Sequence, residues 1–221
     1  VIALVVLMGA WEWAGLIGLD RLSSRLPYLL TILLALGGCW LLLGVGSGGG
    51  ELNRVASAAV LTLGLLFWLL AFVLLRGYPE TSMAWNNRSK IALMGLMALV
   101  PTWVGIVQLK YLMPEGWLVL GLIVMVAAVD VGAYFAGTAF GHTKLAPKLS
   151  PNKSWEGVWG GLATCFLLGL LLTWLLHRFV LPLTAGQGLA LVMLSLTVSF
   201  FGVTGDLVES MLKRNRDIKD S

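Results

Sequence analysis

Charged side chains are scarce in this sequence, and their scarcity excludes an ordinary soluble domain. Asp, Glu, Lys and Arg make up 12% of the 221 residues, whereas 58% are hydrophobic and the mean hydropathy is +0.90. Soluble domains contain about a quarter charged residues and close to half apolar residues. The composition therefore places most of the chain in a lipid bilayer.

Cysteine and histidine are also rare, which argues against a zinc-binding protein and against a disulfide-rich protein. Cys39 and Cys165 lie in separate apolar segments, and His142 and His177 stand alone in separate loops. No second Cys or His lies at the spacing of a zinc site, and two isolated cysteines make no disulfide framework. We interpret both cysteines as small core residues.

Long apolar runs are what the sequence has in abundance. A transmembrane helix needs about 20 mainly apolar residues, because lipid offers the backbone no hydrogen-bonding partner. We predict an all-α, polytopic transmembrane helical bundle with a cytoplasmic C-terminal segment, forming a single integral membrane domain over residues 1–221. The seven predicted spans are 1–19, 27–46, 55–75, 91–113, 117–140, 157–176 and 188–205. Val1 lies inside an apolar run without an initiator Met, so we expect the true N-terminus to lie upstream.

Basic residues are distributed unequally between alternate loops. Cytoplasmic loops retain Lys and Arg, and here one set of loops plus the tail holds twelve of them against three in the other set. We therefore predict that the loops after the first, third and fifth spans, and the tail, are cytoplasmic. The net charge of +4 is interpreted as a topology signal and an attraction to anionic lipids, with no nucleic-acid partner indicated.

One acidic residue, Asp130, is expected near the middle of the fifth span. An acid at that depth costs at least about 2.5 kcal/mol on insertion scales, so it is expected to face a polar cavity and to mark function. Gly132, Ala133, Ala136 and Gly137 nearby allow close approach of a helix or substrate. The alternative is a structural acid that bonds another helix.

The tail from Gly205 onward mixes acids and bases. As a helical continuation of the last span it would align five polar side chains on one face, namely Asp206, Glu209, Ser210, Lys213 and Asp217. A carboxylate such as Asp206 suits Mg²⁺, and Lys213, Arg214 and Lys219 suit phosphate. With apolar residues interleaved, this stripe is expected to face inward. The alternative is an ordinary amphipathic helix with solvated charges.

The loop over residues 141–157 displays three lysines, Lys144, Lys148 and Lys153. Pro147 and Pro151 exclude a regular helix, so we predict a stiff, extended segment that is able to embrace a polyphosphate. Asn152 or Ser154 is expected to cap the next helix, whose N-terminus attracts anions. The alternative is a loop whose charges only fix topology.

Several segments resemble the bacterial phosphatidate cytidylyltransferase family. The most specific is the family signature S-x-x-K-R-x-x-x-x-K-D, which Ser210, Lys213, Arg214, Lys219 and Asp220 match. Other segments are also similar to family members, namely Gly205-Asp206-Leu207 with Glu209, Asp130–Tyr134, Lys144–Lys148, Ser150-Pro151 with Lys153–Gly157, and Trp11-Glu12-Trp13. The sequence departs from the family where it stops at Ser221, before a glycine-rich half that carries a further Asp. We expect those residues to exist in the natural protein.

The resemblance implies that the cytidylyl group of CTP is transferred to phosphatidate in the bacterial cytoplasmic membrane. Mg²⁺ would be held by Asp206, with a second cation left open, and Asp220 would support the metal or orient the tail. Lys213, Arg214 and Lys219, with Glu209 and Ser210 beside them, would hold the lipid phosphate or the triphosphate. Lys144, Lys148, Lys153 and Ser154 would approach CTP, and Asp130 would line the cavity.

Partners implied by the resemblance are CTP, phosphatidate and membrane lipids, with a homodimer left open. Three other functions remain alternatives at this point. One is a transporter in which Asp130 and Glu12 relay ions, one is a structural scaffold, and one is a CTP-dependent enzyme that acts on another lipid.

Overall fold

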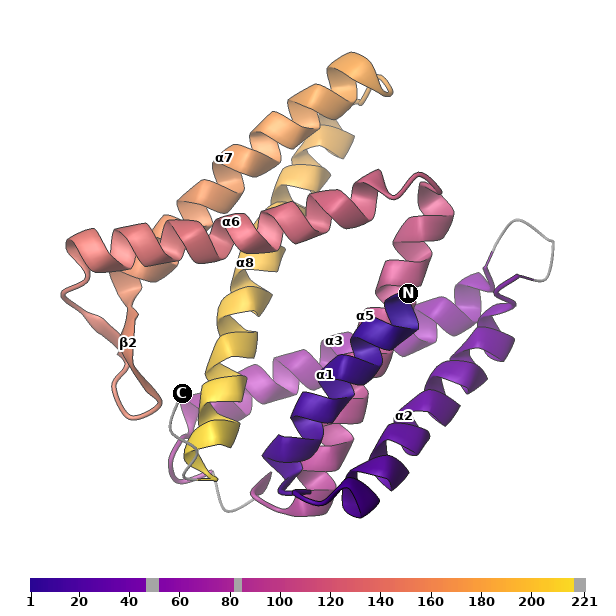
Figure 1. Ribbon diagram of the computed structural model, residues 1–221. Helices are drawn as coiled ribbons and strands as arrows, with labels where there is room; N and C mark the ends of the chain where they lie inside the picture. The colour runs from indigo at the N-terminus through magenta and orange to yellow at the C-terminus, as the bar shows by residue number, and fades with distance from the viewer. Residues whose placement is uncertain (47–51, 82–84, 217–221) are drawn as a thin grey trace. The chain divides into compact units, whose positions relative to one another are not determined.

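A computed structural model describes residues 1–46, 52–81 and 85–216. These residues form seven helices and one two-stranded antiparallel hairpin, so the all-α prediction is confirmed (Figure 1). The helices are α1 (Ile2–Ile17), α2 (Leu22–Leu43), α3 (Arg54–Arg76), α5 (Arg88–Leu112), α6 (Trp117–Phe140), α7 (Trp155–Phe179) and α8 (Ala185–Arg214). Six of them are long and apolar enough to cross a membrane, and α1 is shorter at 16 residues. The chain is a multi-pass membrane protein.

The described chain divides into two compact units. One contains Val1–Trp117 and Leu212–Ser221, and the other contains Leu118–Met211. The prediction of one domain over residues 1–221 stays a prediction.

In the first unit, α5 is the central helix and packs against α1, α2 and α3. Gly95 of α5 permits this close packing, because a Cβ there would lie 2.5 Å from the indole of Trp13 and would overlap the hydroxyl of Tyr28. The indole Nε1–H of Trp13 donates to the Ile91 carbonyl at 2.8 Å, and the Tyr28 hydroxyl donates to the Ala92 carbonyl at 3.4 Å. Both aromatic side chains are therefore fixed to the backbone of α5.

In the second unit, glycines bring α6 and α7 into backbone contact. A Cβ at Gly161 would lie 3.0 Å from the Val129 carbonyl oxygen, and one at Gly160 would lie 2.8 Å from the Gly132 carbonyl oxygen. Helix α7 meets α8 in the same way, because a Cβ at Gly169 would lie 2.9 Å from Cβ of Ser195. Small residues give membrane helices the close packing that replaces a hydrophobic driving force. The small-residue interpretation of the Asp130 segment is consistent with this contact.

Helix α8 continues without a break from its apolar part into the charged tail, as predicted, and ends at Arg214. The burial pattern differs from the predicted inward stripe. Val208, Met211 and Leu212 are buried, whereas Asp206 and Glu209 are exposed. The reason is that burying a carboxylate costs far more than burying an aliphatic group. Asp217, Lys219 and Asp220 lie outside the described residues.

Candidate functional site

The lysine-rich loop forms a hairpin between α6 and α7. Strand β1 (Lys144–Ala146) pairs antiparallel with β2 (Ser150–Ser154), with Lys144 opposite Ser154. The predicted extended conformation is confirmed, whereas the pairing of its two halves was not predicted. Lys144 and Lys148 are exposed on this hairpin, where a solvated ligand can reach them.

Hydrogen bonds fix the hairpin to the first turn of α7. Ser154 is the N-cap, and its hydroxyl accepts the Gly157 N–H at 3.2 Å, which decides between the two predicted caps. The Glu156 carboxylate accepts the Thr143 N–H at 3.0 and 3.2 Å, while the Trp155 N–H donates to the Thr143 carbonyl at 2.9 Å. These contacts hold the residue before the cap, Lys153, in a defined place.

Lys153 reaches across the second unit to Asp206 of α8. Its Nζ lies 2.5 Å from the Asp206 Oδ2, and the two side chains are 29% and 51% exposed. Asp130 of α6 interacts electrostatically with both of them. Two carboxylates and one ammonium, from α6, the hairpin and α8, are thereby brought together, although their residues lie far apart in the sequence.

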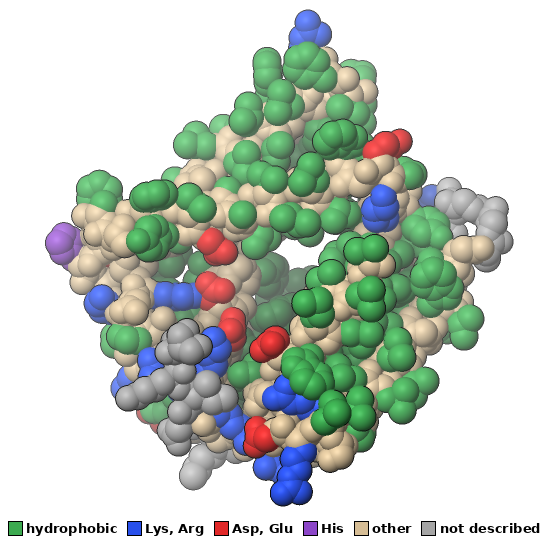
Figure 2. Space-filling view, in the orientation of Figure 1, with side chains coloured by type: hydrophobic (Ala, Val, Ile, Leu, Met, Phe, Trp, Pro, Cys, Tyr) green, Lys and Arg blue, Asp and Glu red, His purple; other side chains and the backbone are tan. Residues whose placement is uncertain are grey.

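Further polar residues continue along α8 from this cluster. Glu209 and Ser210 follow Asp206 by three and four positions, so they lie on the same side of the helix, and Lys213 follows one turn later. Arg214 is the last residue of the helix and is exposed. In Figure 2, acidic and basic side chains gather beside the hairpin, whereas the surfaces of α6 and α7 are mainly hydrophobic.

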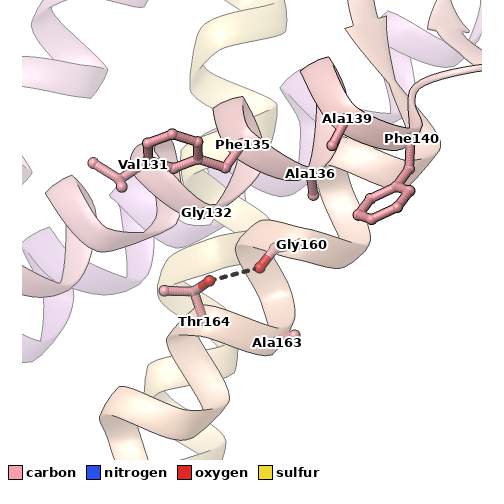
Figure 3. A pocket seen from close by; sticks show the side chains of 9 residues that line it. All are labelled: Val131, Gly132, Phe135, Ala136, Ala139, Phe140, Gly160, Ala163 and Thr164. Atoms are coloured by element: carbon pink, nitrogen blue, oxygen red, sulfur yellow. Dashed lines mark hydrogen bonds between the residues drawn. The ribbon is translucent and has the colours of Figure 1, made fainter.

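A separate apolar groove of about 560 Å³ lies between α6 and α7 (Figure 3). Figure 3 shows Phe135, Phe140 and small residues of α6 facing Gly160, Ala163 and Thr164 of α7. The Thr164 hydroxyl, the lining's polar side-chain group, already donates to the Gly160 carbonyl at 2.9 Å. No charged side chain lines this groove, so the groove offers no charged group for binding phosphate or a metal ion.

The donor set suits a magnesium ion that shares its ligands with a substrate. Within residues 1–46, 52–81 and 85–216, no three His, Cys, Asp or Glu side chains form a complete metal cage. Asp130 and Asp206 provide two carboxylates, and Mg²⁺ commonly takes one or two together with waters and phosphate oxygens. The ammonium of Lys153 lies 2.5 Å from the Asp206 Oδ2, so a positive charge already balances this carboxylate.

Two contacts of the candidate site were missed from the sequence. The direct contact between Lys153 and Asp206 joins residues 53 positions apart, and no local pattern encodes such a distance. The Glu156–Thr143 hydrogen bonds were also missed. An acidic residue two positions after a serine cap was the available signal, since acids are favoured in the first turn of a helix.

The six long apolar helices define a multi-pass membrane protein, and its second unit carries a charged cluster of Asp130, Lys153 and Asp206. The sequence profile of the cytidylyltransferase family matches residues 1–221, and the chain belongs to this family. The phosphatidate cytidylyltransferase of Pseudomonas aeruginosa is 41% identical over 220 residues, which cover 100% of this chain and 75% of that protein. The phosphatidate cytidylyltransferase of Haemophilus influenzae is 33% identical over 230 residues, covering 98% of this chain and 77% of that protein.

Proposed function

We propose that this protein transfers the cytidylyl group of CTP to phosphatidate, forming CDP-diacylglycerol and releasing pyrophosphate. A phosphate oxygen of phosphatidate attacks the α-phosphorus of CTP, and the bond from that phosphorus to the bridging oxygen of the β-phosphate breaks. Family membership and the names of the relatives support this reaction over transport or a scaffold role. The protein acts within the bacterial cytoplasmic membrane, as a single chain or as a homodimer, with the acyl chains in the bilayer.

The observation that carries the proposal is the contact between Lys153 and Asp206, with Asp130 in electrostatic range of both. Phosphoryl transfer requires little covalent help and depends on positioning and charge neutralisation. A carboxylate next to an ammonium offers a place for a metal cation and a positive charge for phosphate oxygens. Asp206, together with Asp130, would hold Mg²⁺, which neutralises charge on the phosphate oxygens when bound.

The basic residues divide into two groups by their place in the fold. Lys144, Lys148 and Lys153 on the hairpin would contact the triphosphate of CTP. Lys213 and Arg214 at the end of α8 would hold the phosphate of the lipid, with Lys219 and Asp220 following them in the signature. Glu209 and Ser210 lie between these groups and would orient the substrates.

Ser154 was predicted both as a helix cap and as a residue near CTP, and the structure favours the first role. Its side chain is 5% exposed and its hydroxyl caps α7, so we assign it the positioning of Lys153 rather than contact with nucleotide. The N-terminus of α7 is itself occupied, since Ser154 and Thr143 already accept two of its N–H groups. The hairpin lysines are therefore the better phosphate ligands.

The decisive experiment replaces Asp206 with Asn, which keeps the shape of the side chain and removes its charge. In detergent or liposomes, CTP-dependent formation of CDP-diacylglycerol should fall at least roughly a hundredfold, because a group acting on transition-state charge is lost. Binding of Mn²⁺ with CTP, followed by electron paramagnetic resonance, should weaken in parallel. Asp20→Asn is the matched control, because Asp20 is an exposed acid between α1 and α2. Wild-type turnover in D206N would remove this residue from the site.

A further inference from the structure

The side chain of Arg216 connects the tail to the C-terminal end of α1 by hydrogen bonds. Arg216 Nε donates to the Leu16 carbonyl oxygen at 3.0 Å, and its Nη2 donates to the Ile17 carbonyl oxygen. The backbone N–H of the same residue donates to the Lys213 carbonyl at 3.1 Å. Arg216 therefore joins the last turn of α8 to a helix that lies about two hundred positions earlier in the sequence.

The end of α1 is built to receive this guanidinium. Gly18 adopts a left-handed conformation at φ 81°, and its N–H and that of Leu19 bond the Gly15 and Ala14 carbonyls. The last carbonyls of a helix have no partner within it and carry partial negative charge, so a cation is favoured there. A Cβ at Gly18 would lie 2.8 Å from Cζ of Arg216, so the missing side chain also makes room for the arginine.

We propose that Arg216 is a positioning residue that sets the path of the phosphate-binding tail. This inference rests on the proposed function. Lys213 and Arg214 precede Arg216 by three and two positions, and Lys219 and Asp220 follow by three and four. The arginine is not one of the signature residues, yet its contacts with α1 fix the backbone just after Lys213 and Arg214. With the guanidinium bonded to α1, the end of α8 that carries Lys213 and Arg214 is held in place.

A second arginine at the same turn provides an internal control. Arg25 of α2 donates from Nε to the Leu19 carbonyl at 2.7 Å, and its guanidinium lies 4.5 Å from the centre of the Trp11 ring. Arg25 thus bonds the turn that follows α1, and among residues 1–46, 52–81 and 85–216 it makes no hydrogen bond to the tail. Loss of Arg25 tests the stability of this turn, and loss of Arg216 tests the tail as well.

The kinetic test compares Arg216→Ala, Arg216→Lys and Arg25→Ala in the full chain. We expect R216A to raise the KM for phosphatidate or CTP and to lower kcat, with kcat/KM falling about tenfold to a hundredfold, as expected for misplaced substrate-binding groups. R216K should recover part of the lost kcat/KM, because lysine keeps the positive charge but lacks the guanidinium that bonds the Leu16 and Ile17 carbonyls together. R25A should keep the KM values of the wild type. Equal kinetics in R216A and wild type would overturn the proposal.

A structural readout separates this inference from the proposed function. Limited trypsin digestion, with the fragments identified by mass spectrometry, should cleave after Lys213 and Arg214 faster in R216A than in wild type or R25A. Gly18→Ala should reproduce the faster cleavage, because its methyl group would occupy the place of the guanidinium. If R216A and G18A are cleaved after Lys213 and Arg214 as slowly as the wild type, Arg216 does not hold the tail to α1. Wild-type protein that forms no CDP-diacylglycerol would instead contradict the proposed function while leaving the digestion result intact.

Discussion

At the scale of single residues, Lys153 has two potential partners, a carboxylate and a substrate phosphate. Replacing it with Ala removes the cation that lies 2.5 Å from Asp206 Oδ2. We expect the KM for CTP to rise roughly tenfold to a hundredfold, the size of one lost charge-assisted contact. Steady-state kinetics at saturating phosphatidate measure this. Lys110→Ala is the control, because the Lys110 ammonium bonds the Pro114 carbonyl in another loop. An unchanged KM for CTP in K153A would mean that the hairpin lysines only fix the topology of the chain in the membrane.

The two candidate caps of α7 give a second residue-scale prediction. Ser154→Ala removes the hydroxyl that accepts the Gly157 N–H, whereas Asn152 is exposed and caps nothing in the described structure. S154A should lower the free energy of unfolding by about 1 kcal/mol and raise the KM for CTP, since Lys153 is the preceding residue. Asn152→Ala should change neither. Thermal unfolding in detergent and initial-rate assays measure both effects. Equal effects of S154A and N152A would refute the assignment of Ser154 as the cap of α7.

At the scale of elements, the crossing of α6 and α7 depends on glycine at one position and not at another. A Cβ at Gly132 would lie 2.7 Å from Cβ of Thr164 and 3.0 Å from the Gly160 carbonyl oxygen, whereas one at Gly121 meets nothing within 4 Å. Gly132→Ala should therefore destabilise the protein by about 1 to 3 kcal/mol through overpacking. Activity should fall with it, because Asp130 lies two residues away on the same helix.

The control for this prediction is Gly121→Ala in the same helix. That variant should keep or slightly raise the melting temperature, because alanine favours the helix and has room for its methyl group. Unfolding followed by circular dichroism in one detergent compares the two directly. A melting temperature in G132A equal to that in G121A would show that the helices do not touch at Gly132.

Some features of these elements could be predicted from the sequence, and others could not. The long helices were predictable because about 20 apolar residues in a row form a local signal, and α8 was expected to continue into its charged end. The pairing of β1 with β2 and the contact of Lys153 with Asp206 were not predictable, because each depends on where distant segments pack. The direction of the acidic stripe was wrong for a related reason. Val208 and Met211 are buried in the folded chain, and sequence spacing alone does not say which face of a helix is buried.

At the scale of the whole molecule, the distribution of charge predicts the side of the membrane on which each loop lies. Single cysteines at Pro147, Glu115 and Leu181 sample the hairpin and two loops that carry fewer basic residues. The native thiols interfere little, because Cys39 and Cys165 are 9% and 0% exposed. A membrane-impermeant maleimide should label Pro147→Cys in inverted vesicles only, and the other two in right-side-out vesicles only. Labelling of all three from one side would contradict the topology and the access of CTP to the hairpin.

The contact of Lys153 with Asp206 also bears on the order in which the site fills. An ammonium that already neutralises the carboxylate competes with free metal, so Mg²⁺ alone should bind weakly. A triphosphate offers that ammonium a new partner and brings ligands for the metal, so each of the two should tighten the other's binding by the same factor. Catalysis would then begin from a nucleotide that arrives with its magnesium, and the empty enzyme would spend little time holding a bare divalent ion.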